Sequence, residues 1–316
     1  MHSLALATTL ALAAANPVSA QDELLRADSL FRNGRVFAAE SLYYLAARRE
    51  PRNPATRLAL GRYLAARGAL KVGAVLMEEA RFFGGDPDAV ARELAPVYAR
   101  IGDYRALTGL PAGVLTSAER ARAEWLRMNP PSHAGPDSLA VAYVPGEGEG
   151  EGLGRVTIVI AGDTAEAVID PSVFGLVLDT AWLRRKELRH FPGGGGASAR
   201  GEVGVTPLAR MGALTLTNTA TRFLPTGGRR RARIGLDVLG NFAATFDPSA
   251  SRIFLRRNGA FDDEAPGTHI ATLTLPTGVW LITDQVTPLS SESGRAQLRG
   301  RRWTVNPKRG EIVVGG

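Results

Sequence analysis

The sequence predicts a multidomain chain of the α-then-β class, with a helical array followed by a mainly antiparallel β domain. Gly34, Gly68 and Gly102 are each 34 residues apart, and a fixed period of this length is the signature of stacked helical hairpins. From Arg155 onward the apolar residues alternate with polar ones instead. A period of two indicates strands, so the architecture changes near that residue.

Residues 1–20 are almost uncharged and rich in Ala and Leu, and they end in Val18-Ser19-Ala20 before a polar stretch. This pattern is typical of a secretory signal peptide with small residues before its cleavage point. The alternative is an ordinary buried helix. No later stretch approaches the ~20 apolar residues that a membrane span requires. We therefore expect an exported protein, periplasmic or secreted, without a membrane span.

Residues 21–128 resemble tetratricopeptide repeats, each of which is a helix-turn-helix unit. The glycines would supply the turns, and the expected units are 22–49, 54–83 and 87–110, with a helix over 117–128 as a cap. Positions that keep the same phase are Leu30, Leu64 and Tyr98 before the glycines, and Ala38, Val72 and Ala106 after them. The resemblance implies a protein partner for the array, while a spacer or a dimer contact stays open.

Pro and Gly punctuate the next stretch, at 129–136 and again at 146–152, so we expect a linker over 129–154. After it, the sequence predicts a strand over 156–160, a tight turn and a returning strand over 165–170. A short apolar strand follows at 176–178, and Asp179 is expected to cap a helix over 180–188.

The segment 155–258 resembles a retropepsin-like aspartic protease domain. The resemblance rests on the loop Asp170-Pro171-Ser172 and on the spacing around it: Gly162 in the preceding hairpin, Gly175-Leu176-Val177-Leu178 after the loop, and Ile234-Gly235-Leu236-Asp237-Val238-Leu239 further on. It implies a barrel with Asp170 as the catalytic residue and Gly235 and Asp237 in a structural turn. It also implies a mobile flap at Gly193, Gly194, Gly195 and Gly196.

The catalytic motif departs from the family pattern, which is Asp-Thr-Gly or Asp-Ser-Gly. Aspartic proteolysis needs two carboxylates about 3 Å apart that share one proton. One copy of the domain supplies one aspartate, so an active enzyme implies a homodimer through the β domain. Pro171 has neither a hydroxyl nor an N–H, and Ser172 adds a side chain where the family has none. We therefore expect hydrolysis to be impaired or lost.

Two alternatives stay open: a working endopeptidase that tolerates Asp-Pro-Ser, and a non-catalytic scaffold that binds peptide or protein. A second register, with Asp179-Thr180-Ala181 as the motif, fails because the hairpin glycine and the apolar strand then fall out of phase. Residues 259–316 are expected to form a β-meander extension, and a vestigial second lobe is the alternative.

Composition limits the remaining functions. The chain has no cysteine and four scattered histidines, so we expect no disulfide, no metal site and no cofactor. The net charge is +7, but only Lys71, Lys186 and Lys308 among the 38 basic residues are lysines. We interpret the arginines as a composition bias and the run at 229–233 as a solvated hairpin tip. No nucleic-acid partner is therefore expected.

Overall fold

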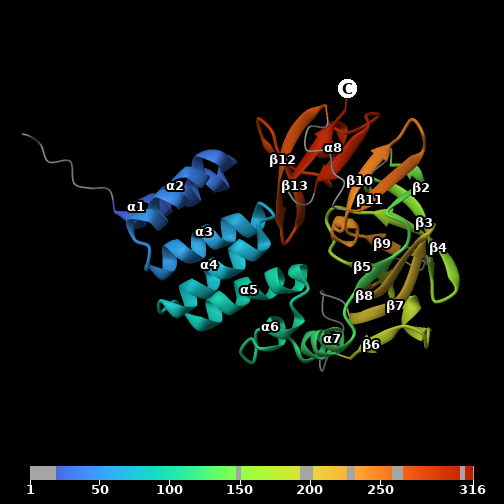
Figure 1. Ribbon diagram of the computed structural model, residues 1–316, viewed down its shortest axis with the longest axis horizontal. Helices are drawn as coiled ribbons and strands as arrows, with labels where there is room; N and C mark the ends of the chain where they lie inside the picture. The colour runs from blue at the N-terminus through green and yellow to red at the C-terminus, as the bar shows by residue number, and fades with distance from the viewer. Residues whose placement is uncertain are drawn as a thin grey trace, which may run out of the picture.

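The computed structural model describes residues 19–146, 151–192, 202–225, 232–257, 266–306 and 310–315. Helices come first and a β-rich part with a closed barrel follows, so the predicted fold class is confirmed (Figure 1). We call α1 to α7 the helical part and β1 to β16 the β part. No helix within these described ranges has both the length and the apolar character that a bilayer crossing requires.

The helical part consists of three hairpins and a final helix. Its elements are α1 (Ala20–Arg32), α2 (Val36–Arg49), α3 (Pro54–Ala66), α4 (Leu70–Phe82), α5 (Pro87–Ile101), α6 (Tyr104–Thr108) and α7 (Ser117–Met128). Local sequence explains where they begin. Asn53 and Asp86 cap α3 and α5, and each of these helices has proline in its first turn. Thr116 opens α7 with a capping box.

The three glycine turns lie at the end of the helical part that faces the β part. Their φ angles are +75° at Gly34, +92° at Gly68 and +79° at Gly102, a left-handed conformation that glycine adopts without strain. A methyl group added at Gly34 would lie 3.4 Å from Val286. Beside Gly68, the Arg67 guanidinium donates to a carbonyl oxygen of β12 at 2.5 Å. The repeat therefore sets a row of turns against the β part.

Among the described residues, six strands form the barrel. They are β3 (Gly154–Ile160), β4 (Asp163–Ile169), β5 (Leu176–Asp179), β7 (Glu202–Met211), β8 (Leu214–Leu224) and β9 (Ala232–Ile234). The hydrogen-bonded order is β3-β4-β9-β5-β8-β7, and β7 pairs with β3 to close the circle. Its interior is filled by fully buried side chains, among them Ile158, Ile169 and Phe223. Two short strands extend it: β6 (Arg189–Phe191) beside β7 and β1 (Ser132–Ala134) beside β8.

A second sheet completes the β part. It contains β2 (Ser138–Pro145), β10 (Phe242–Asp247), β11 (Arg252–Arg257), β12 (Thr268–Leu275), β13 (Gly278–Ile282), β14 (Val286–Pro288), β15 (Trp303–Asn306) and β16 (Glu311–Val314). The order is β14-β13-β12-β16-β15-β10-β11-β2, and β2 also pairs with β3, which joins this sheet to the barrel. The short helices are η1 (Thr180–Arg184), η2 (Leu236–Leu239) and α8 (Glu292–Ala296).

Three expectations about these elements need correction. The stretch 129–154 contains β1 and β2, because Leu139, Val141 and Tyr143 alternate with exposed residues and bury one face of a strand. The last sheet is not a simple meander, since β16 pairs with β12 and β15 pairs with β10. The helix expected over 180–188 is a single 3₁₀ segment that ends at Arg184.

Candidate functional site

Asp170 stands where β4 ends, at a crossing of the chain over β9. Its backbone N–H donates to the carbonyl oxygen of Ile234 in β9 at 2.9 Å. Strand β9 runs parallel to β4 on one side and antiparallel to β5 on the other. The loop 170–175 therefore passes over the end of β9. At that end, the Gly235 N–H donates to the Gly175 carbonyl oxygen at 2.9 Å.

Both carboxylate oxygens of Asp170 are engaged by neighbours in the same chain. Oδ1 accepts the Ser172 N–H at 2.8 Å and the Ser172 hydroxyl at 2.6 Å. Oδ2 lies 3.3 Å from Nη1 of Arg233, the residue that precedes Ile234 in β9. The Asp170 side chain is 12% exposed, and that of Arg233 is 47% exposed. This is an Asx turn closed by an ion pair.

Asp237 holds the other side of the loop. Its two carboxylate oxygens accept the Gly175 N–H at 2.9 and 3.0 Å. Gly235 has no room for a side chain, because an added methyl group would lie 2.4 Å from the Val173 carbonyl oxygen. Neighbouring protein atoms around the Asp237 carboxylate act to raise its pKa, although the residue as a whole is exposed. The Gly175 N–H and the Arg100 guanidinium act in the opposite direction.

Two other parts of the chain cover the loop. From the last sheet, Val279 in β13 donates its N–H to the Pro171 carbonyl oxygen at 2.9 Å. Gly278 lies so close that an added methyl group would be 2.4 Å from the same oxygen. From the helical part, the Arg100 guanidinium stacks on the Phe174 ring at 5.9 Å. The loop is thus held between β13 and the end of α5.

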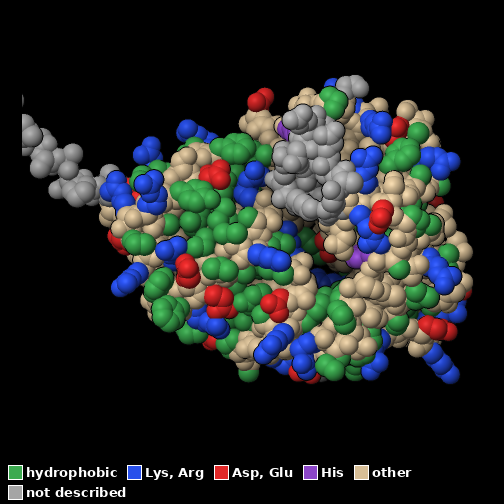
Figure 2. Space-filling model, in the orientation of Figure 1, with side chains coloured by type: hydrophobic (Ala, Val, Ile, Leu, Met, Phe, Trp, Pro, Cys, Tyr) green, Lys and Arg blue, Asp and Glu red, His purple; other side chains and the backbone are tan. Residues whose placement is uncertain are grey.

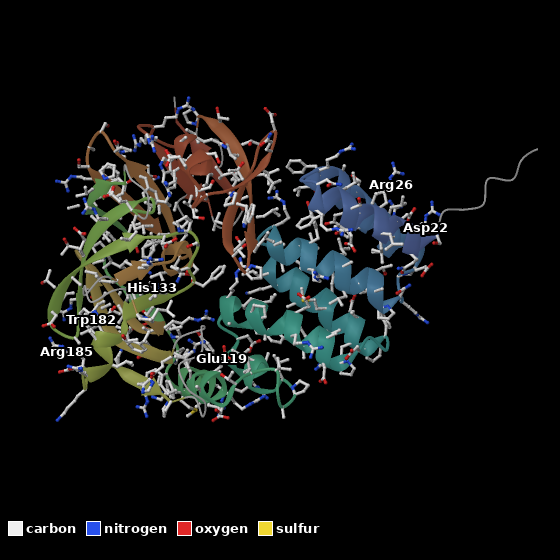
Figure 3. The ribbon with its side chains drawn as sticks, turned by 180° about the vertical axis from the view of Figure 1, so that it is seen from behind. Asp22, Arg26, Glu119, His133, Trp182 and Arg185 are labelled. Carbon is white, nitrogen blue, oxygen red and sulfur yellow. The ribbon has the colours of Figure 1, made fainter. Side chains whose placement is uncertain are left out.

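Asp179, the alternative aspartate, lies at the far end of β5 from the Asp170 loop. Its Oδ1 accepts the Ala181 N–H at 2.8 Å and caps η1. Trp182 of η1 and the following Arg185 lie on the side of the barrel away from the helices (Figure 3). The structure therefore does not bring Asp179 to Asp170.

The expected flap residues Gly193, Gly194, Gly195 and Gly196 fall outside the described residues. Strands β6 and β7, on either side of them, pair in antiparallel fashion. Within the described ranges, no group of three His, Asp or Glu side chains lies close enough together to hold a metal ion.

Sequence reasoning missed Arg233 and the contact from β13. Arg233 was assigned to the exposed arginine run, yet its position directly before the Ile234-Gly235 turn was the signal that it borders the Asp170 loop. The sequence around Gly278 and Val279 gives no sign that they contact the Asp170 loop. The contact arises only from the order of strands in the last sheet.

No family model and no curated protein matches this chain. Among solved structures, it is similar to a retropepsin-like aspartic protease from Rickettsia conorii, with 10% sequence identity and a TM-score of 0.27. The likeness covers 40% of this chain and 92% of that one. A likeness at this level decides nothing about chemistry, so the function has to be argued from the residues of the Asp170 loop.

Proposed function

We propose that this chain is an exported scaffold protein, built from tetratricopeptide-like repeats and a retropepsin-like barrel, in which peptide-bond hydrolysis has been lost. Its role is to bind a protein or a peptide. Export is proposed from the composition of residues 1–20. The retropepsin relationship is proposed from the crossing of the Asp170 loop over β9, held by the turn at Gly235 and Asp237.

We infer the loss of hydrolysis from the contacts of Asp170, which are of the same kinds as those of Asp247. Asp247 ends β10 in a plain hairpin turn, and it is also followed by proline and serine. Its Oδ1 accepts the Ser249 hydroxyl at 2.6 Å, and its Oδ2 lies 3.8 Å from Arg302. Asp170 thus carries the contacts of a carboxylate that closes a turn.

Hydrolysis asks for a different arrangement. One carboxylate has to polarise a water molecule while a second, about 3 Å away, donates a proton to the scissile carbonyl. Ser172 and Arg233 already contact the two carboxylate oxygens of Asp170 that would have to hold the water. The loop is also bonded to β13 of its own chain, through the Val279 N–H and the Pro171 carbonyl oxygen. We therefore propose that the chain functions without an aspartate dyad.

The test is cleavage of an unfolded protein across pH 3–7, with the purified chain beside its Asp170→Asn variant. The expected result is no cleavage by either protein, together with retained folding by circular dichroism. Cleavage by the wild type that disappears in the variant would establish a peptidase and overturn the proposal. Equal cleavage by both would overturn it as well, because hydrolysis would then proceed through other residues.

A further inference from the structure

The third hairpin of the helical part lacks most of its second helix. The second helices of the first two hairpins, α2 and α4, have 14 and 13 residues, whereas α6 has five. Helix α6 ends at Thr108 with Gly109 as its C-cap, and Pro111 follows two residues later, where a further helical turn would lose a backbone hydrogen bond. The chain then continues to α7, which packs on α6 and on β6 and β7.

A groove lies along α4 and α5, next to the short α6. Its cavity volume is about 800 Å³, and it runs along α4 and α5 up to the start of α6. Its apolar lining consists of Ala74, Val75, Phe82, Tyr98 and Ile101. Phe82 is 84% exposed and Val75 58% exposed, although both are apolar. Figure 2 shows that hydrophobic side chains gather over the helical part on the face viewed there.

The two most exposed apolar residues of the lining are seven positions apart on α4. Residues at this spacing lie two turns apart on the same face of a helix, so Val75 and Phe82 form an apolar stripe along the groove. Three of the charged lining residues, Glu78, Glu79 and Arg81, are already paired within the chain. Glu78 contacts Arg81 at 2.5 Å, and Glu79 contacts Arg57 at 3.2 Å. Lys71 and Asp103 also line the groove. What the groove offers a partner is therefore mainly apolar surface, with Lys71 and Asp103 at its edges.

We propose that this groove binds one amphipathic helix of a partner protein, next to the short α6. The walls are helices, whose backbone groups are used in their own hydrogen bonds. An extended peptide would leave its N–H and C=O groups unpaired against such walls, whereas a helix satisfies its own. From Lys71 to Phe82 the wall spans about 17 Å at 1.5 Å per residue, which fits a partner helix of about three turns.

The chain itself shows what kind of helix fits beside such walls. In the second hairpin, α4 packs on α3 through a buried face that contains Gly73, Met77 and Ala80, at i, i+4 and i+7. Gly73 allows the close approach, because an added methyl group would lie 2.7 Å from the Gly61 carbonyl oxygen. We therefore expect a partner helix with small and flexible apolar side chains at that spacing.

The inference specifies the binding role proposed above, and it does not depend on what Asp170 does. The probe is a synthetic peptide with the sequence of α4, labelled with fluorescein. It is held helical by a staple between the positions of Lys71 and Val75, which its buried face does not use. Fluorescence anisotropy against the full chain should give saturable binding. Val75→Asp or Phe82→Asp should weaken it about 10-fold or more.

Val72→Asp is the matched control. Val72 lies on the same helix and is 55% exposed, but it does not line the groove, so binding should be unchanged. Absence of peptide binding, or binding that Val75→Asp leaves intact, overturns the proposal. A wild-type dimer in sedimentation velocity that Val75→Asp dissociates overturns it too, because the occupant is then a second copy of the chain. These outcomes are independent of the cleavage assay.

Discussion

Val279 and Pro171 are joined by a backbone hydrogen bond of 2.9 Å, although 108 positions separate them in the sequence. The bond ties the last sheet to the loop that carries Asp170. Because Arg100 stacks on Phe174 at the other side of the same loop, the helical part reaches it as well. The candidate site therefore lies at a junction between the barrel, the last sheet and the helices.

Gly278→Ala should destabilise the chain more than Gly300→Ala. Both glycines have positive φ, +118° and +70°, so both substitutions introduce backbone strain. At Gly278 the new methyl group would also lie 2.4 Å from the Pro171 carbonyl oxygen, whereas nothing lies within 4 Å at Gly300. We expect Gly278→Ala to lower the free energy of unfolding by about 2 kcal/mol more than the control. Urea denaturation measures both, and equal losses would contradict the close contact.

Introducing the Asp-Thr-Gly motif of retropepsin-like proteases, with Pro171→Thr and Ser172→Gly, should not produce hydrolysis. The loop remains covered by β13, and the double variant loses the Ser172 hydroxyl that donates to Asp170 at 2.6 Å. We expect a loss of about 1 kcal/mol in the free energy of unfolding, typical of one hydrogen bond. Cleavage of a casein substrate at pH 3–7 is the measurement. Activity gained by this variant would show that the motif alone, and not the covering sheet, prevents catalysis.

The sequence predicted the features that depend on residues close together in the chain, namely turns and single strands. The period of Gly34, Gly68 and Gly102 predicted the hairpin turns, since a left-handed residue ends each first helix. The alternation from Arg155 predicted the first strands of the barrel. The strand β2 was missed because proline and glycine on both sides outweighed its own alternation. The cover over Asp170 was not predictable, because Gly278 reaches it only through the pairing order of distant strands.

His133 should make stability fall as the pH drops below its ordinary pKa of 6.5. Burial lowers the pKa of this imidazole, and Arg257 acts in the same direction, while the Val238 carbonyl oxygen acts against both. Its ring nitrogens contact that oxygen at 3.2 Å and the Asn241 amide at 2.9 Å. Figure 3 shows His133 in the β part, and the residue is half-buried there. The folded state thus prefers neutral imidazole, so the stabilisation is full above pH 6.5 and is lost below it.

The measurement for His133 is urea denaturation at pH 7.5 and pH 5.5. The free energy of unfolding should fall between these values, and the fall should be smaller in His133→Gln. His190 and His269 contact Glu202 and Glu311 and remain in both proteins, so their contributions cancel in the comparison. An equal fall in the two proteins would assign the pH dependence to other groups.

Asp247→Asn should destabilise the chain at pH 7 and much less at pH 3. The Ser249 hydroxyl and the Ala250 N–H hold the pKa of this carboxyl below its ordinary value of 3.8. A lowered carboxyl pKa stabilises the folded state above pH 3.8, and that stabilisation is lost as the pH falls through the lower value. The difference in urea midpoint between wild type and variant should therefore shrink from pH 7 to pH 3. A constant difference would mean that charge plays no part in this turn.

Asp170→Asn provides the matching test of the turn role proposed for Asp170. The side chain is mostly buried, and its oxygens accept from Ser172 and Arg233, so the substitution weakens one ion pair and removes charge from two hydrogen bonds. We expect the free energy of unfolding at pH 7 to fall by about 1 kcal/mol. Catalytic carboxylates commonly lower the stability of the folded state, so replacing one then stabilises the protein. A more stable Asp170→Asn variant would therefore assign Asp170 to a working site and contradict the turn.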